Sequence, residues 1–543
     1  MKTVNDNKSF SLLVLIFIIA VYSALIVFTD FYEIYTGDST MYLDIAEKYL
    51  RGDFADAVNG YWGPMFSWLL MPFLYFGAGK VSAINSLNII VGVLTLAGVW
   101  VLSFRFEVSD RVRGAILISL LPIILFVSIV ELHDFLLLCF LVYYLAVIFN
   151  NEYPGRAYNG MICGVLGAVA YFTKSYAFPF FIVHFIFMNI AHFIRCSTKS
   201  EKRHVLRNAI AGMVLFSVLS GAWITAISHK YNRFTISNMG KANFAAMAPG
   251  LPDTGYELGN PVFHEGFFPP SNKTAYSAWE DPSYIMSELP GWSPVRSISY
   301  FEYFLKNISR NITECIRIFG AFSRLSYTII IAYILLLTVP SFNRQILRGD
   351  ILYSFFTLVL FTGGYMPFHL ELRYLWIVNI LLLLMGGYVL TILFQHSFFK
   401  SNMRKNVLIV LFALSFILTP LKSYIQEGHD NINRQMYALS LQIKNKFNIQ
   451  GNIASNREWK CIAVHDSWHK TFRLAYHLNS RYYGQAKKDI SDSELETELK
   501  KYNIDYYFIW GENQHIPKFL LNHKEITGGA IPGLEIFALK QVH

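Results

Sequence analysis

The chain has 543 residues, of which 54% are hydrophobic, 16% aromatic and only 15% charged. Soluble proteins carry about 25% charged residues, so this composition excludes an ordinary soluble enzyme. The net charge of +9 is divided among short segments between apolar runs, and no long basic stretch with interleaved aromatic residues offers a groove for nucleic acid, so no nucleic-acid partner is expected.

Apolar runs of membrane-spanning length recur from near the first residues to about Pro420. A helix needs roughly 17 to 25 apolar residues to cross a hydrocarbon core of ~30 Å. We therefore predict an α-helical integral membrane protein with about 11 transmembrane helices. The predicted spans are residues 9–29, 82–104, 114–131, 134–149, 157–173, 176–194, 208–228, 320–340, 351–367, 374–395 and 406–420.

Basic residues in the connections between these runs indicate the orientation. If the N-terminus is cytoplasmic, the cytoplasmic connections carry basic clusters at 105–113, 195–207 and 400–405. The short connections on the other side carry essentially only Lys174 and Arg373. Because Lys and Arg concentrate in cytoplasmic loops, we expect a cytoplasmic N-terminus in a multi-pass protein of the bacterial inner (plasma) membrane.

One apolar run, Pro64–Gly77, has only about 14 residues and is too short for a span. If it crossed the membrane, every later connection would change sides and the basic clusters would lie outside. We therefore predict a helix that lies in the membrane interface or re-enters it. It shares the first outer loop, about 30–80, with an amphipathic stretch over 41–50.

The polar sequence divides the chain into a transmembrane domain, residues 1–423, and an extracytoplasmic domain, residues 424–543. A second outer loop, about 229–318, is rich in Pro, Gly and aromatic residues. The extracytoplasmic domain alternates short strand-like runs with a helix, which is typical of a small α/β fold. A capping box opens a predicted helix over 491–501. The predicted strands are Cys461–His465, Tyr506–Trp510 and Glu535–Leu539.

Asp38 follows the first predicted span, in the stretch Thr36-Gly-Asp-Ser-Thr40. One interpretation is a helix N-cap, in which Asp38 or its neighbour Ser39 accepts hydrogen bonds from free backbone amides. The other is a carboxylate at the water boundary that takes a proton from an acceptor hydroxyl. The two roles are compatible, and Asp38 is the candidate catalytic base.

Glu131, His133 and Asp134 occupy the short turn between two long apolar runs. A turn needs polar residues, and this alone accounts for some of them. However, three ionisable groups within four residues exceed what a tight hairpin requires, and charges at membrane depth are costly. This acidic turn is therefore a candidate acceptor site, or a site for a divalent metal ion with His133 among its ligands. The sequence requires no cofactor.

Lys174 and Arg373 are lone cations at the ends of predicted spans, on the side where cations are disfavoured. Each is consistent with a side chain that snorkels to the interface. The alternative is a pair that binds an anionic headgroup, because the arginine fork and the lysine point charge both suit phosphate. His369, Glu371 and Tyr374 flank Arg373 and are further candidates to orient it or to contact a ligand.

Motifs of several other enzyme classes are absent from the sequence. There is no Walker P-loop, no dinucleotide-binding glycine pattern after a strand, no HExxH and no GxSxG. The five cysteines are scattered without CxxC spacing or a Cys/His cluster, so neither a disulfide framework nor a structural zinc site is expected.

At these residues the chain resembles the polytopic GT-C glycosyltransferases that use polyprenyl-phosphate sugars. The relatives are the protein O-mannosyltransferases and the bacterial lipid A aminoarabinose transferase. The likeness covers most of residues 9–395, although this sequence has Glu-Leu before Arg373 where the family pattern has a proline. The shared features are Gly37-Asp38 with Tyr42 and Ala46, Tyr61-Trp-Gly-Pro64, Arg373-Tyr374 at the start of a span, and a soluble tail.

The resemblance implies a GT-C transmembrane domain and inverting transfer of a hexosyl or pentosyl group at the extracytoplasmic face. Asp38 corresponds to the acidic residue of the first outer loop that is the family's candidate general base. Glu131 and Asp134 correspond to a second polar site. Arg373 corresponds to the family's phosphate-contacting arginine.

In this reading the donor phosphate lies against Lys174, Arg373 and Tyr374. The implied partners are a polyprenyl-phosphate sugar donor, membrane lipids, and an acceptor that is a glycan, a lipid or a protein. An alternative is a transporter or flippase for an amphiphilic or lipid-linked substrate, although the sequence has no internal repeat. A receptor or assembly scaffold is a third possibility. Only the enzyme would release polyprenyl phosphate in the presence of acceptor.

Overall fold

The chain, described here from a computed structural model, forms two compact units. The first consists of Met1–Tyr32, Gly63–Ile236 and Glu302–His429, and the second of Glu33–Trp62, Ser237–Phe301 and Asp430–His543. The residues that the structure describes are 9–29, 37–130, 132–156, 158–246, 248, 266–282, 292–338, 349–429, 432–457, 466–512 and 514–540.

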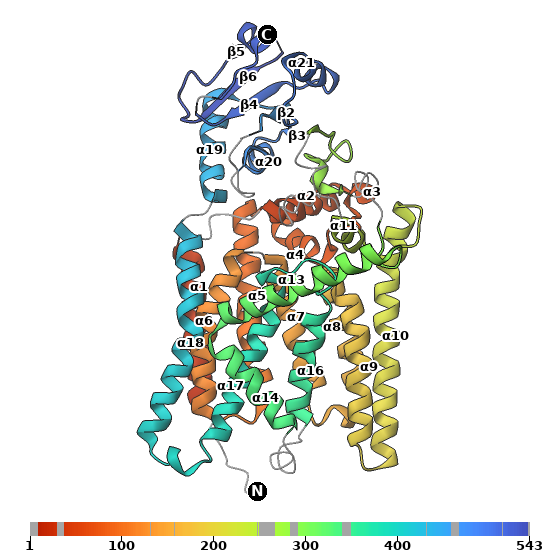
Figure 1. The fold of residues 1–543 in the computed structure, drawn as a ribbon, viewed down its shortest axis with the longest axis vertical. Coiled ribbons are helices and arrows are strands. Elements are labelled where there is room, and N and C mark those ends of the chain that lie inside the picture. Colours follow the sequence, from red (N-terminus) through yellow and green to blue (C-terminus); the bar gives the residue numbers. More distant parts are fainter. Residues whose placement is uncertain are drawn as a thin grey trace. The chain divides into compact units, whose positions relative to one another are not determined.

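The first unit is helical, and each run that the sequence predicts as a span contains a helix (Figure 1). The prediction of an α-helical membrane protein is confirmed. These helices are α1 (Ser9–Phe28), α5 (Lys80–Ser103), α6 (Asp110–Val130), α7 (Leu132–Ile148), α8 (Tyr158–Thr173), α9 (Ala177–Arg195), α10 (Lys199–Lys230), α14 (Leu325–Thr338), α16 (Gly349–Gly363), α17 (Trp376–Leu393) and α18 (Asn402–His429).

The predicted number of about 11 spans is not established. Within the described residues, seven helices are long and apolar enough to cross a membrane. Helix α13 (Ile298–Phe322) and α14, which meet at a bend of 110°, make an eighth candidate when they are counted as one span. Helices α7, α8 and α16 are apolar but have 17 residues or fewer. A straight helix of that size is about 26 Å long, at the lower limit for a span.

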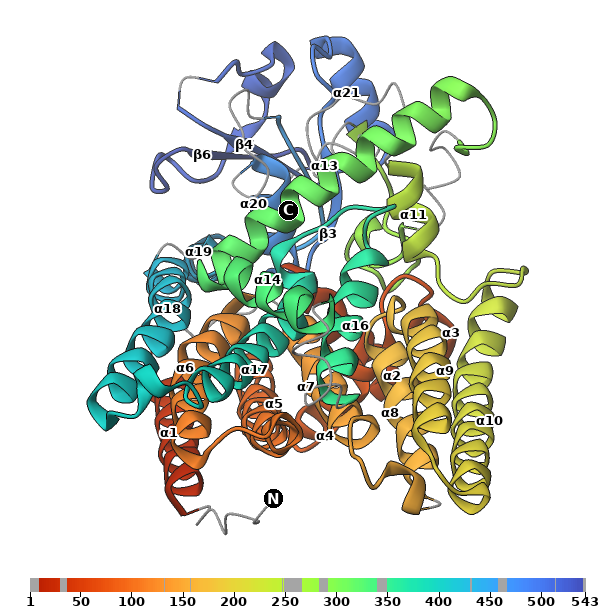
Figure 2. The same ribbon diagram turned by 60° about the horizontal axis from the view of Figure 1, so that its bottom comes forward.

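Small residues allow α8 and α10 to pack with their backbones in contact. A Cβ atom on Gly160 would lie 2.0 Å from the carbonyl oxygen of Asn208, and one on Gly164 would lie 2.3 Å from that of Gly212. Close approach of this kind is a common way to pack helices in a membrane, where apolar lipid gives no hydrophobic drive for association. Both ribbon views show α8, α9 and α10 side by side (Figures 1 and 2).

The short apolar run within the predicted first outer loop forms helix α4 (Pro64–Tyr75), which has only 12 residues. Pro64 stands in its first turn, where the missing N–H costs nothing. A Cβ atom on Gly63 would lie 2.3 Å from the carbonyl oxygen of Phe172, so glycine lets α4 begin directly against the end of α8. A helix too short to span is therefore confirmed, and its position in the membrane interface stays a prediction.

Helix α13 was not predicted, because its sequence lies in the segment expected to be the second outer loop. It is amphipathic: Ile298, Phe301 and Ile316 are exposed on one side, whereas Asn307 and Asn311 are buried. Polar residues recur at every turn, so a search for uniformly apolar runs passes over it.

The second unit contains a six-stranded mixed sheet with strand order β1-β3-β2-β4-β6-β5. Strands β3, β2 and β4 are parallel, and the remaining neighbours are antiparallel. Leu495, Leu499 and Tyr507 belong to the hydrophobic core of this unit. The strands are β1 (Gly266–Phe267), β2 (Asn452–Ser455), β3 (Arg481–Gln485), β4 (Tyr506–Trp510), β5 (Lys524–Glu525) and β6 (Leu534–Ala538).

The predicted α/β character of the tail is confirmed at three elements. Strand β4 has the predicted bounds, β6 lies one residue before them, and α21 (Asp492–Lys501) begins at a capping box formed by Ser491 and Glu494. The predicted strand 461–465 lies outside the described residues. Strand β1 comes from the second outer loop and was not predicted.

The remaining helices of the second unit include the amphipathic stretch predicted in the first outer loop. That stretch forms α2 (Gly37–Arg51), which packs against α20 (Ser467–His477). The others are α3 (Phe54–Ala57), α11 (Met239–Ala246) and α19 (Ile432–Phe447).

Candidate active site

The first unit contains a cluster of ionisable side chains drawn from three separate segments. Asp134 lies in the first turn of α7, Lys174 directly follows α8, and Glu371 and Arg373 lie between α16 and α17. Lys174 Nζ donates a hydrogen bond of 2.5 Å to Asp134 Oδ1, and Arg373 Nε lies 3.9 Å from Asp134 Oδ2. Arg373 Nε also donates to Glu371 Oε2 over 2.7 Å. Residues far apart in the sequence thus form one site.

Three further residues that the sequence analysis singled out join this cluster. Tyr374 Oη donates to Glu371 Oε1 over 2.9 Å, and His369 Nε2 lies 3.6 Å from the same oxygen. His133 Nε2 lies 3.5 Å from Asp134 Oδ2. The two carboxylates are therefore the centres around which the basic and aromatic groups are arranged.

A column of tyrosine rings supports Lys174. Its ammonium group lies 3.7 Å from the centroid of the Tyr374 ring. That ring stacks on Tyr365 at 5.1 Å, and Tyr365 stacks on Tyr176 at 3.9 Å. Tyr176 Oη in turn donates to the carbonyl oxygen of Phe361 over 2.6 Å. Because a cation is attracted to the face of a tyrosine ring, this column holds Lys174 in a defined place.

The segment that carries Arg373 is held by a side chain from α13. Asn311 is buried, and its Nδ2 donates to the carbonyl oxygens of Met366, over 2.8 Å, and of Phe368. This part of the chain is not a regular helix, so its carbonyl groups need donors from elsewhere. After it, a short 3-10 turn over Leu372–Leu375 leads into α17. Helix α13 thus positions the arginine.

The side chains of this cluster differ in their exposure to solvent. The side chain of Asp134 is 1% exposed and that of Lys174 is 7% exposed. The side chains of Arg373 and Glu371 are 20% and 26% exposed. A ligand that approaches this site therefore meets Arg373 before it reaches Lys174.

The formal charges of Lys174, Arg373, Asp134 and Glu371 cancel. Burial raises the pKa of Glu371, but the nearby Arg373 and His369 outweigh this effect, so the pKa is lowered and the carboxylate is ionised at neutral pH. Burial lowers the pKa of Lys174, and Asp134 opposes this shift. Burial also lowers the pKa of His369, which favours the neutral ring. An anionic ligand must therefore compete with the two carboxylates for the two cations.

Two predicted site residues are not part of this cluster as described. Asp38 lies in the first turn of α2, in the second unit, and is half-buried. Helix α2 begins at Gly37, so Asp38 lies within the first turn, where the helix dipole favours an acidic residue. Its approach to Lys174 and Arg373 stays a prediction. Glu131 lies outside the described residues.

Within the described part of the chain, no group of three or more His, Cys, Asp or Glu side chains is arranged to hold a metal ion. His133 and Asp134 alone supply too few ligands for a typical protein metal site. We therefore assign no step to a metal.

Sequence analysis missed Asn311, Tyr365 and Tyr176 as site residues. Tyr176 stands two residues after Lys174, so its place beside the site was open to prediction. Asn311 lies in a segment that was interpreted as a loop, and Tyr365 lies in an apolar run where tyrosine is common. Neither carries a signal in a single sequence.

Comparisons with known proteins show this architecture in solved structures. No family model and no curated protein sequence matches the chain. The archaeal oligosaccharyltransferase AglB from Archaeoglobus fulgidus, solved with an inhibitory peptide and a dolichol-phosphate, is 12% identical, with a TM-score of 0.54 over 92% of this chain and 69% of that chain. ArnT from Cupriavidus metallidurans in the apo state is 11% identical, with a TM-score of 0.54 over 96% of this chain and 97% of that chain.

At such low identity the comparisons establish the fold. This fold is the one expected from the family resemblance, which rests on the residues around Asp38, Tyr61–Pro64 and Arg373. The chain has the architecture of the GT-C membrane glycosyltransferases.

Proposed function

We propose that this protein is a membrane glycosyltransferase that moves a hexosyl or pentosyl group from a polyprenyl-phosphate donor to a hydroxyl acceptor at the extracytoplasmic face, with inversion. The observation that carries the proposal is the buried Lys174–Asp134 pair beside the partly exposed Arg373. Cations at the ends of apolar helices suit a ligand with a phosphate group and a long apolar chain. The dolichol-phosphate in the structure of AglB, which has the same fold, supports this ligand class.

In the proposed reaction, the acceptor oxygen attacks the anomeric carbon while the bond from that carbon to the phosphate oxygen breaks. The phosphate keeps the electron pair of the broken bond and leaves as polyprenyl phosphate. Asp38 takes the acceptor proton. Arg373 and Lys174 stabilise the charge that develops on the leaving phosphate, which is commonly the largest catalytic contribution. A single displacement inverts the anomeric configuration.

Asp134 and Glu371 act as counter-ions before the donor arrives. Each carboxylate contacts a cation that the donor phosphate would also contact. A buried Lys174 without a counter-ion, beside the partly exposed Arg373, would be strongly destabilising, so the carboxylates stabilise the folded site. When phosphate binds, it shares the cations with them, and Asp134 remains available as the second polar group beside the acceptor.

The experiment uses purified full-length protein, polyprenyl-phosphate sugars of two kinds (mannose and aminoarabinose), and a bacterial envelope extract as the source of acceptor. The measurement is the release of polyprenyl phosphate. Wild-type protein should release it only when acceptor is present. Arg373→Ala should lower the rate by about 100-fold, the usual order for loss of a group that stabilises developing charge.

The matched control is Arg317→Ala, because Arg317 is exposed on α13 and pairs with Glu314 of the same helix. This variant should keep the wild-type rate. Movement of the labelled donor across vesicles without release of polyprenyl phosphate would instead establish the transporter alternative.

A further inference from the structure

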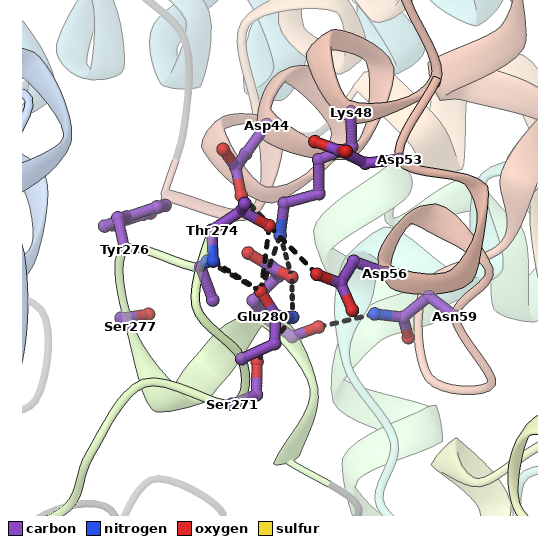
Figure 3. A network of polar contacts seen from close by, with 12 residues as sticks. Asp44, Lys48, Asp53, Asp56, Asn59, Ser271, Thr274, Tyr276, Ser277 and Glu280 are labelled. Carbon is purple, nitrogen blue, oxygen red and sulfur yellow. Dashed lines mark hydrogen bonds and ion pairs between the residues drawn. The ribbon is translucent and has the colours of Figure 1, made fainter. Parts of the chain in front are cut away.

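The second unit contains a buried ionic cluster that the proposed reaction does not use. Helix α2 contributes Asp44 and Lys48, one turn apart, and the segment 271–282 contributes Glu280 (Figure 3). Asn272 of the same segment also contacts Lys48. Lys48 Nζ donates to Glu280 Oε1, lies 3.4 Å from Asp44 Oδ2 and donates to Asn272 Oδ1 over 3.5 Å. We call Asp44, Lys48 and Glu280 the Lys48 cluster.

The Lys48 cluster is sealed. The side chains of Lys48 and Glu280 are both fully buried. The ammonium group of Lys48 donates two hydrogen bonds, to Glu280 and Asn272, and forms an ion pair with Asp44. A substrate anion cannot reach the buried ammonium group, so the Lys48 cluster is not a ligand site. We interpret it as a structural link between α2 and the segment 271–282.

The net charge of the Lys48 cluster is zero only if one of its two carboxyl groups is protonated. Two carboxylates face one ammonium group, and an unpaired buried charge is very costly. Burial, followed by the hydrogen bond and charge of Asp44, raises the pKa of Glu280 well above its usual value, and Lys48 opposes the shift. Asp56, also drawn in Figure 3, accepts a hydrogen bond from the hydroxyl of Thr274 over 3.2 Å. Protonated Glu280 leaves Lys48 to balance Asp44.

Other contacts tie both ends of α2 to the same segment. Near the start of the helix, the hydroxyl groups of Thr40 and Tyr276 lie 2.6 Å apart in a hydrogen bond. Beyond its end, Asn59 Nδ2 donates to the backbone oxygen of Glu280 over 2.6 Å. Trp62 Nε1 donates to the backbone oxygen of Trp279 over 3.2 Å. In the sequence, the Lys48 cluster lies between these contacts. The contacts on either side of it are hydrogen bonds, whereas the cluster also contains ion pairs.

The segment 271–282 is in turn fixed to the sheet. The backbone N–H of Tyr482, in β3, donates to the oxygen of Tyr276 over 2.6 Å. Arg481 Nη2 donates to the backbone oxygen of Asn272 over 3.1 Å. Asn272 is therefore anchored by its backbone to β3 and contacts Lys48 through its side chain. A continuous set of contacts leads from the sheet to the helix that carries Asp38.

We propose that Lys48, Asp44 and Glu280 are positioning residues: through segment 271–282 they fix α2 to the sheet, so that the Asp38 carboxylate is presented in one orientation. The proposal rests on the proposed function, because it assigns these residues a role through the candidate base. None of the three touches the reacting atoms. A rigid support for a catalytic group matters because small displacements of such a group slow the reaction strongly.

Three substitutions in the full-length protein test the proposal. Lys48→Met removes the charge, Glu280→Ala removes the carboxyl group, and Glu280→Gln mimics the protonated acid. The matched control is Lys500→Met, because Lys500 pairs with Glu496 at the same i,i+4 spacing but is exposed. The measurements are the hydrogen exchange of the α2 amides, and kcat and KM for polyprenyl phosphate release from the donor.

Lys48→Met and Glu280→Ala should raise the exchange rate of the α2 amides at least about tenfold. Both should lower kcat at least about tenfold with an unchanged donor KM, because the base is displaced while the donor site is intact. Glu280→Gln and Lys500→Met should stay within about threefold of wild type in both measurements. If Lys48→Met fails to fold, the pair of Glu280 variants carries the comparison.

Wild-type exchange of α2 in Glu280→Ala would overturn the link, and faster exchange with an unchanged kcat would overturn the positioning role. If the wild-type protein transfers no sugar, the proposed function fails, but the exchange measurement still tests the link to α2. The two failures are therefore distinguishable.

Discussion

Lys48 and Lys174 are both buried beside carboxylates, and they illustrate how surroundings decide what a buried cation does. Lys48 is fully enclosed by acceptors from its own unit. Lys174 has one carboxylate and one tyrosine face, and its neighbour Arg373 reaches solvent. The first arrangement leaves no part of the ammonium group accessible. The second places the ammonium group beside a partly exposed arginine, which is why only Lys174 is proposed to bind the donor.

The geometry of Arg373 predicts that its charge alone is insufficient. Arg373→Lys retains the charge but loses the planar fork that contacts two phosphate oxygens. We expect binding of undecaprenyl phosphate to weaken about tenfold, less than with Arg373→Ala. Native mass spectrometry or a thermal-shift titration measures this. Equal affinities for wild type and Arg373→Lys would show that the fork does not contact the phosphate.

Asp38→Asn tests the base. The amide cannot accept the acceptor proton, so transfer should fall by about 100-fold or more, within the range expected for general-base catalysis. The size of Asn and its ability to cap a helix both favour an intact α2. The yield and the hydrogen exchange of α2 serve as controls. Full transfer activity with this substitution would remove the assignment.

The proton held by the Lys48 cluster predicts a specific dependence of stability on pH. The pKa of Glu280 is raised in the folded state, so its contribution to stability is present below the unfolded value of about 4.3 and is lost as pH rises toward the folded value. Wild-type protein should therefore lose stability relative to Glu280→Gln as pH rises from about 5 to 9. Thermal unfolding of both proteins across this range measures the difference, and parallel curves would contradict it.

At the scale of elements, the contact between α8 and α10 depends on glycine. A Cβ atom on Gly212 would lie 2.5 Å from the carbonyl oxygen of Gly160, whereas one on Gly221, in the same helix, would meet nothing within 4 Å. Gly212→Ala should destabilise the folded state by about 2 kcal/mol or more, because the backbones must separate. Gly221→Ala should be neutral or slightly stabilising. The midpoint of thermal unfolding in detergent compares the two.

The helices and strands also show how much of the fold a single sequence predicts. Long apolar runs predicted the spanning helices of the first unit, a capping box predicted α21, and a short strand-like run predicted β4. All three signals are local in the sequence. Helix α13 and strand β1 were missed, since one mixes polar and apolar residues and the other is defined by a partner far along the chain. Of the site, Lys174, Arg373, Asp134 and their neighbours were predicted as unusual charges in apolar surroundings. Asn311 and Tyr365 become recognisable only through their contacts.

At the scale of the whole molecule, the proposed donor site and the candidate base lie in different units. The side chains proposed to bind the donor belong to the unit of apolar helices, and the candidate base belongs to the unit that contains the sheet. Catalysis in the form proposed requires both units together.

Because strand β1 lies outside the C-terminal tail, residues 424–543 do not contain the whole sheet. Gly266 and Phe267 pair with Gln485 and Gly484, so one edge of β3 is covered by residues that precede it by more than two hundred positions. An uncovered edge strand is a template for pairing with another chain. Residues 424–543 expressed alone should therefore self-associate, which light scattering would detect, and a synthetic peptide of residues 266–282 should return them to monomers. A monodisperse, monomeric tail without the peptide would mean that β3 tolerates a bare edge.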